Sequence, residues 1–172
     1  MNLPKPLFFG LFVLSATVSW AESVRTIRLH PAESAPIAVG TLTMLNDGGY
    51  RVDWDDSKFG DFFLSMRPFR CIEGAAKHWC YVPYPYEIRR KVTEDDLTDL
   101  EYDLLFIWKG ATEYGINMWN GVYYQLEIAD GRITGSISEM DMDQLAVPPD
   151  TGVLRPIRAQ DVEEGDPESH WL

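Results

Sequence analysis

The sequence has few of the residue types from which enzymes most often build reactive centres. Its 172 residues include three histidines and two cysteines. It contains neither a G-x-S-x-G nucleophile motif nor a glycine-rich phosphate-binding motif. The cysteines and histidines are too few and too scattered to supply the four ligands of a structural zinc site. We therefore expect neither a bound metal nor a cofactor.

Positive charge is also scarce. The chain has 15 lysine and arginine residues against 27 aspartate and glutamate residues, which gives a formal net charge of −12. Proteins bind DNA or RNA largely by neutralising phosphates with basic side chains. We therefore expect no nucleic-acid partner.

Long hydrophobic runs are confined to the N-terminus, where LFFGLFVLSATV follows Lys5. Ser19-Trp20-Ala21 then places small residues at the two positions that signal peptidase reads. We predict a secretory signal peptide over residues 1–21, cleaved before Glu22, and hence a periplasmic or extracellular location. An uncleaved anchor is the alternative, although the run is short for a membrane span. No later segment predicts a transmembrane helix.

Cys71 and Cys80 are the only cysteines of the chain. Two cysteines in an exported domain usually pair with each other. The predicted disulfide closes a short loop, and the loss of chain entropy in the unfolded state gives it a contribution of about 2.5–3 kcal/mol. We expect the bridge to hold an irregular loop, with at most a short strand around Trp79.

The segment around the cysteines, residues 67–91, is basic and aromatic. Its six basic and two acidic residues give it a net charge of +4. Alternating proline and tyrosine in YVPYPYEI keep the chain extended. The segment either packs against its own acidic domain or forms a recognition surface for a partner or an anionic ligand. The candidate binding residues are Arg67, Arg70, Arg89, Arg90, Trp79, Tyr81, Tyr84 and Tyr86.

Short segments with alternating or β-branched residues predict several strands. They lie at 24–30, 37–45, 50–54, 61–67 and 102–109. Asn and Asp beside glycines in NDGG, residues 46–49, indicate a hairpin turn. Thr93 is expected to cap a short helix that ends near Leu100 or Glu101. One helix running through to Trp108 is the alternative.

The segment GVYYQLEIADGRITGSIS, residues 121–138, predicts a hairpin with a turn at Asp130-Gly131. That turn pairs Ile128 with Ile133, Leu126 with Gly135 and Tyr124 with Ile137. The apolar residues of both arms then share one face, and a slip of one residue would break this match.

These elements predict a single mainly β domain over residues 22–158. Seven or eight antiparallel strands and one short helix would form a small barrel or a two-layer sandwich. Residues 159–172 have no hydrophobic period and are expected to be a disordered acidic tail.

Three functional hypotheses fit this sequence. The first is a non-enzymatic exported domain that binds a small apolar or anionic ligand or a protein partner. The second is a structural subunit of an envelope assembly. The third is a hydrolase-type enzyme with carboxylates such as Glu101, Asp103 or Glu127, whose pKa values would have to be shifted by burial or by neighbouring charge.

Aromatic residues supply a further candidate site. Aromatic side chains line many apolar pockets, and they also fill hydrophobic cores. The residues concerned are Trp54, Trp79, Trp108, Trp119, Tyr123 and Tyr124.

Intact-mass spectrometry of the exported protein tests the predicted processing and the disulfide together. We expect a chain that begins at Glu22, with a mass two hydrogens below that of the reduced form. Two thiols that react with an alkylating reagent before reduction would contradict the disulfide. A mass that includes residues 1–21 would contradict the cleavage.

Overall fold

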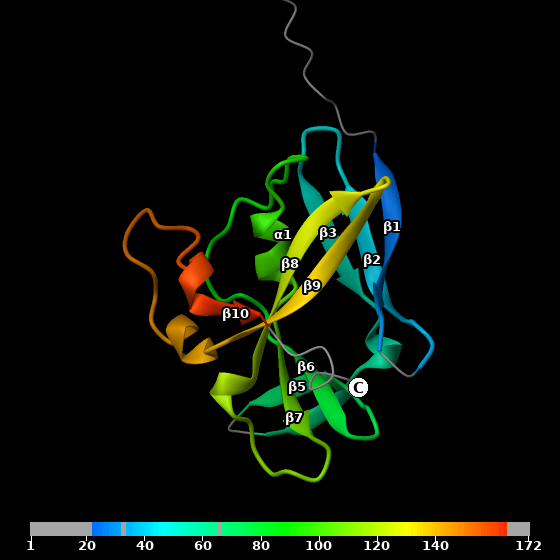
Figure 1. The fold of residues 1–172 in the computed structure, drawn as a ribbon, viewed down its shortest axis with the longest axis vertical. Helices are drawn as coiled ribbons and strands as arrows, with labels where there is room; N and C mark the ends of the chain where they lie inside the picture. Colours follow the sequence, from blue (N-terminus) through cyan, green and yellow to red (C-terminus); the bar gives the residue numbers. More distant parts are fainter. Residues whose placement is uncertain (1–21, 32–33, 65–66, 165–172) are drawn as a thin grey trace, which may run out of the picture.

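The computed structural model describes residues 22–31, 34–64 and 67–164 and shows a mainly β protein with one short α-helix (Figure 1). Two antiparallel sheets contain three and seven strands, and no hydrogen-bonded strand pair joins the two sheets within the described residues. The predicted fold class is therefore confirmed, with more strands than expected. The predicted signal peptide, residues 1–21, lies outside the described residues.

The three-stranded sheet consists of consecutive antiparallel strands. Its strands are β1 (Ser23–Leu29), β2 (Ile37–Met44) and β3 (Tyr50–Trp54). The turn between β2 and β3 contains Gly48 with a φ of 80°, a conformation that glycine adopts without a Cβ clash. The NDGG segment therefore forms the predicted turn.

The seven-stranded sheet is a meander, because every strand pairs with its neighbour in the sequence. Its strands are β4 (Gly60–Phe63), β5 (Pro68–Ile72), β6 (Lys77–Tyr81), β7 (Phe106–Gly110), β8 (Gly121–Ala129), β9 (Arg132–Met140) and β10 (Val162–Glu164). Residues 159–164, expected to belong to a disordered tail, instead form a short 3₁₀ turn and β10, which pairs with β9. Residues 165–172 lie outside the described residues.

The β8–β9 hairpin has the register predicted from the sequence. Ile128 pairs with Ile133, Leu126 with Gly135 and Tyr124 with Ile137. The turn residues Asp130 and Gly131 have φ angles of 51° and 70°. This left-handed pair is the geometry of the tight hairpin turns that match the twist of their strands.

The disulfide joins Cys71 to Cys80 as predicted, but the loop it closes is more regular than expected. The two cysteines lie directly opposite each other on the paired strands β5 and β6, with 3.9 Å between their Cα atoms. Residues 68–72 and 77–81 alternate between the two faces of the sheet. The bridge therefore links a hairpin rather than an irregular loop.

Helix α1 (Thr98–Asp103) begins five residues later than the predicted cap at Thr93. Thr93 and Asp96 hydrogen-bond to each other through their backbones and form a separate turn. The Asp96 carboxylate then accepts a hydrogen bond from the Thr98 backbone N–H at 3.1 Å. The helix is followed by β7, so the chain forms a helix and then a strand.

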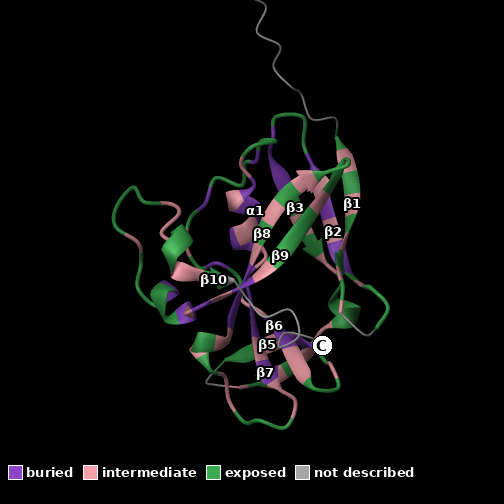
Figure 2. Ribbon diagram, viewed as in Figure 1, coloured by how far each residue is buried: buried purple, intermediate pink, exposed green. Residues whose placement is uncertain are grey.

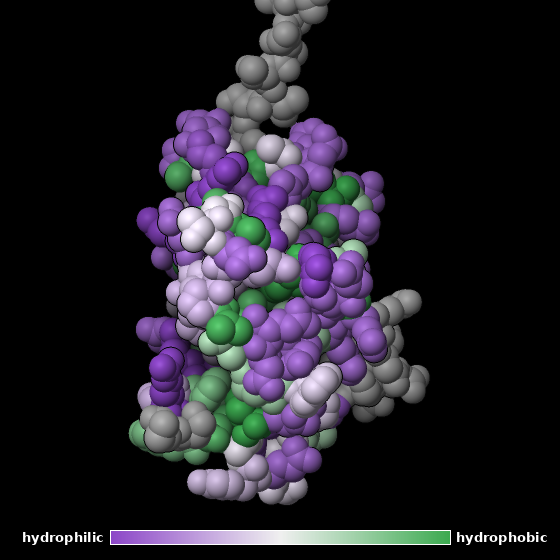
Figure 3. Space-filling view, turned by 90° about the vertical axis from the view of Figure 1, so that its left-hand side faces the viewer, coloured by the Kyte–Doolittle hydropathy of each residue, from purple (hydrophilic) through white to green (hydrophobic). Residues whose placement is uncertain are grey.

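Buried residues occur along the strands of both sheets (Figure 2), and the hydrophobic ones of the seven-stranded sheet lie on both of its faces. One face packs against the three-stranded sheet through a cluster of Val39, Ile72, Trp79, Phe106 and Val122. The other face is covered by irregular segments. They include residues 82–88, which we call the Tyr-Pro segment, and residues 142–157. On the side of the molecule in Figure 3, apolar residues appear as small groups among hydrophilic ones.

Polar side chains of α1 connect segments that are far apart in the sequence. Asp103 accepts hydrogen bonds from the Tyr50 hydroxyl on β3 at 2.8 Å and from the Arg90 Nε at 3.0 Å. Glu101 accepts hydrogen bonds from the Tyr123 hydroxyl and from the Leu126 backbone N–H, both on β8. The helix therefore joins the three-stranded sheet to the centre of the larger one.

Helix α1 also contacts residues 142–157, which we call the C-terminal segment. Asp99, 1% exposed, accepts hydrogen bonds from the Arg155 Nε at 2.6 Å and from the Lys91 backbone N–H at 3.0 Å. Arg155 also pairs with Asp96 at 2.7 Å. The hydrogen bond from Arg155 holds the pKa of the Asp96 carboxyl below its usual value. This contribution to stability is present above about pH 4 and is lost as the pH falls through the lowered pKa.

The Asp99→Asn substitution tests the connection to the C-terminal segment. It removes the charge that pairs with Arg155, and we expect the free energy of unfolding to fall by about 2 kcal/mol. Asp95→Asn is the matched control, because Asp95 is exposed in the same segment and should cost less than about 0.5 kcal/mol. Urea denaturation measures both, and equal values for the two variants would contradict this role of Asp99.

Replacing both cysteines with alanine tests the contribution of the disulfide. We expect the double variant to lose about 2.5–3 kcal/mol of unfolding free energy while keeping its β-sheet circular dichroism. The wild type measured with and without a reductant is the control. A double variant as stable as the oxidised wild type would contradict the prediction.

Candidate functional site

A cleft of about 1150 Å³ lies between β1 and the β8–β9 hairpin. It forms because β1 does not pair with the neighbouring part of β9, residues 132–137, which lies outside the three residues of β9 that pair with β10 (Figure 1). Pockets for small molecules usually enclose about 300–1,000 Å³. The cleft is therefore large enough for an organic ligand.

Aromatic side chains line the inner part of the cleft. The Trp54 ring meets that of Phe106 edge to face, with 5.6 Å between their centroids. The Trp79 Nε1–H donates a hydrogen bond to the Tyr124 hydroxyl at 2.9 Å. Both sheets enclose Tyr124, and this burial raises the pKa of its hydroxyl. Tyr124 is therefore neutral at physiological pH.

Aliphatic side chains form the walls of the cleft. Ile27 and Leu29 project from β1, and Leu126, Ile133 and Ile137 project from the hairpin. All five lie on the inward faces of their strands, yet each stays partly exposed to solvent. Inward-facing apolar residues normally lose nearly all contact with water. The partial exposure therefore reflects a gap between the strands.

The polar residues at the cleft include three arginines and one histidine. These are Arg25, Arg28, Arg132 and His30. No aspartate or glutamate is among the described residues that line the cleft, although the chain has 27 of them. The cleft is therefore a basic region in an acidic protein.

Arg25 joins the two sides of the cleft. Its Nη1 donates a hydrogen bond at 2.8 Å to the carbonyl of Gly131 in the β8–β9 turn. Arg25 shares a strand face with Ile27 and Leu29, which places its side chain on the cleft side of β1. Sequence analysis missed this residue, although an arginine at an inward position of an alternating strand is a readable signal.

The arginines predicted to form a binding surface are not gathered at one place. Arg70 pairs with Asp56 and lies over the Phe59 ring, and Arg90 pairs with Asp103. Arg67 and Arg89 are exposed. Their role in binding stays a prediction.

The predicted aromatic binding residues point mainly into the protein. Trp79 lines the cleft, and Tyr81 packs beside it against Trp54 and Phe106. The hydroxyls of Tyr84 and Tyr86 donate hydrogen bonds to backbone carbonyls of the C-terminal segment, at 3.4 and 2.9 Å. The Tyr-Pro segment thus packs against its own domain.

Only some of the tryptophan and tyrosine residues predicted to line an apolar pocket lie at the cleft. Trp54, Trp79 and Tyr124 meet at the cleft, whereas Tyr123 is buried on the opposite face of the sheet and Trp119 is 69% exposed. Strand alternation separates Tyr123 from Tyr124.

The carboxylates considered for catalysis do not converge on the cleft. Glu101 and Asp103 are hydrogen-bonded within the fold as described above, and Glu127 is exposed on the outer face of β8. No group of three or more potential metal ligands occurs among the residues that the structure describes. Within those same residues, no helix is long and apolar enough to cross a membrane.

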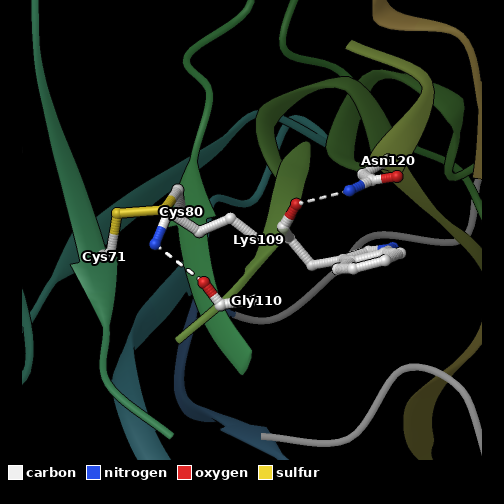
Figure 4. Close-up of a disulfide and its surroundings, with 6 residues drawn as sticks. Cys71, Cys80, Lys109, Gly110 and Asn120 are labelled. Atoms are coloured by element: carbon white, nitrogen blue, oxygen red, sulfur yellow. Dashed lines mark hydrogen bonds between the residues drawn. A yellow bond between two sulfur atoms is a disulfide. The ribbon is translucent and has the colours of Figure 1, made fainter. Parts of the chain in front are cut away.

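The disulfide lies on the opposite face of the sheet from the cleft, beside a buried lysine (Figure 4). Lys109 extends toward Cys80, and its Nζ donates a hydrogen bond to the Gly110 carbonyl at 2.8 Å. Asn120 donates to the Trp108 carbonyl at 3.2 Å. None of the residues in these contacts lines the cleft.

Comparisons with known proteins find no matching family model, curated protein or solved structure.

Proposed function

We propose that this protein is an exported, non-enzymatic β-domain that binds an apolar small molecule in the cleft between β1 and the β8–β9 hairpin. The observation that carries the proposal is the row of inward-facing, partly exposed aliphatic side chains around an aromatic inner part. Ile27, Leu126 and Ile133 belong to this row. These residues occupy the position that a hydrophobic core would fill if β1 paired with β9.

The hydrophobic effect supports this function. Each Å² of apolar surface removed from water contributes roughly 25 cal/mol. A ligand in the cleft would cover apolar side chains of both sheets at once. The Trp79 indole N–H is buried and already donates a hydrogen bond to the Tyr124 hydroxyl. An apolar ligand beside it would therefore leave no buried donor without an acceptor.

The disulfide supports the exported location, since such bonds persist in oxidising compartments and are rare in the cytosol. The hydrolase alternative lacks comparable support, because Glu101 and Asp103 are engaged in holding the fold together. For the structural-subunit alternative, the described residues present no surface that specifically favours it.

Fluorescence of the neutral dye N-phenylnaphthylamine tests the proposal. We expect the wild type to enhance the dye's emission and to bind it saturably at one site. Ile133→Trp places a large side chain in the cleft and should weaken dye binding at least tenfold. Ile128→Trp is the matched control, because Ile128 pairs with Ile133 in the hairpin but does not line the cleft.

Thermal unfolding of both variants checks that the hairpin remains folded. Absence of saturable dye binding to the wild type would overturn the proposed function. Equal effects of the two tryptophan substitutions would place the dye elsewhere.

A further inference from the structure

We propose that the ligand of the cleft is an amphipathic carboxylate whose head group is bound by Arg25. This inference rests on the proposed function and specifies the chemical class of the ligand. It starts from the contrast between the apolar walls of the cleft and the arginines beside them.

Arg25 has hydrogen-bonding capacity that the described residues do not use. A guanidinium carries five N–H donors in a planar fork that fits a carboxylate. Arg25 donates one hydrogen bond, to the neutral carbonyl of Gly131. An incoming carboxylate can accept from the remaining donors or replace that carbonyl, and charge-assisted bonds are stronger than neutral ones.

The ion pairs among the described residues divide the arginines into two groups. Five arginines form ion pairs with aspartates: Arg51, Arg70, Arg90, Arg155 and Arg158. Within the described part of the chain, no ion pair involves Arg25, Arg28, Arg89 or Arg132, and three of these four line the cleft. Three arginines without a carboxylate partner, at a cleft without described acidic lining residues, favour an anionic ligand.

The position of Arg25 sets the shape of the ligand. Its hydrogen bond to Gly131 places it beside the β8–β9 turn, which lies near the start of β1 (Figure 1), and Leu29 lies four residues further along the strand, about 13 Å away. The Trp54 ring lies level with Ile27 between them, because Gly40 pairs with both residues. A ligand with its head at Arg25 can therefore extend an apolar chain over the aromatic inner part.

Displacement of N-phenylnaphthylamine by dodecanoate and by dodecanol tests the inference. The two probes share one chain and differ in the charge of the head group. We expect the wild type to bind dodecanoate at least tenfold more tightly than dodecanol, since one charge-assisted interaction accounts for that ratio. Added sodium chloride should weaken the binding of dodecanoate only.

Arg25→Gln should remove the preference, because the affinity for dodecanoate should fall at least tenfold and the affinity for dodecanol should fall much less. Arg51→Gln is the matched control, because it makes the same change of charge at an exposed arginine of β3 that does not line the cleft. It should retain the wild-type preference. Loss of dodecanol binding in Arg25→Gln would show that Arg25 maintains the shape of the cleft. It would overturn the role of Arg25 in binding the head group.

The remaining outcomes separate this inference from the proposed function. Dye binding with equal affinities for dodecanoate and dodecanol would overturn the inference and leave the proposed function intact. Failure of the dye and both probes to bind would overturn the proposed function itself. Retention on phosphatidylglycerol vesicles without binding of monomeric dodecanoate would overturn the inference in favour of a membrane surface.

Discussion

The acidic helix α1 is the constraint on which the rest of the fold depends. A helix of six residues has little stability of its own, so it persists through its tertiary contacts. Asp103 reaches β3, Glu101 reaches β8 and Asp99 reaches the C-terminal segment. These partners belong to different parts of the chain, so loss of the helix would release both sheets and the segment that covers them.

The anchoring of β8 by α1 also explains why a cleft exists. Glu101 holds β8 near Tyr123 and Leu126, and the hairpin extends beyond this point without a strand pair to β1. Across that gap, Arg25 donates a hydrogen bond to Gly131 at the end of the hairpin. The hairpin is thus supported at both ends, while its middle stands apart from β1. A fully closed sheet would have buried the same apolar residues and left no room for a ligand.

Features that depend on neighbouring residues could be predicted from the sequence. The β8–β9 register follows from side-chain alternation and from the turn at Asp130-Gly131, and both are local. The start of α1 was missed because Thr93 and Asp96 form a turn of their own, which competes with helix capping. The β5–β6 hairpin was missed because prolines and basic residues around it resemble an irregular segment.

The cleft itself could not be predicted in this way. It results from the absence of pairing between β1 and β9, which are about a hundred residues apart in the chain. Aromatic composition indicated a pocket or a core but could not separate Tyr124, at the cleft, from Tyr123, on the opposite face. The role of Arg25 depends on the same long-range arrangement.

The strict alternation of the β8–β9 hairpin has an evolutionary consequence. Inserting or deleting one residue in the β8 arm would turn Leu126 outward and bring Glu127 into the cleft. Such a change would place a carboxylate among apolar side chains. Selection for the cleft would therefore tolerate substitutions within this hairpin far more readily than changes in its length.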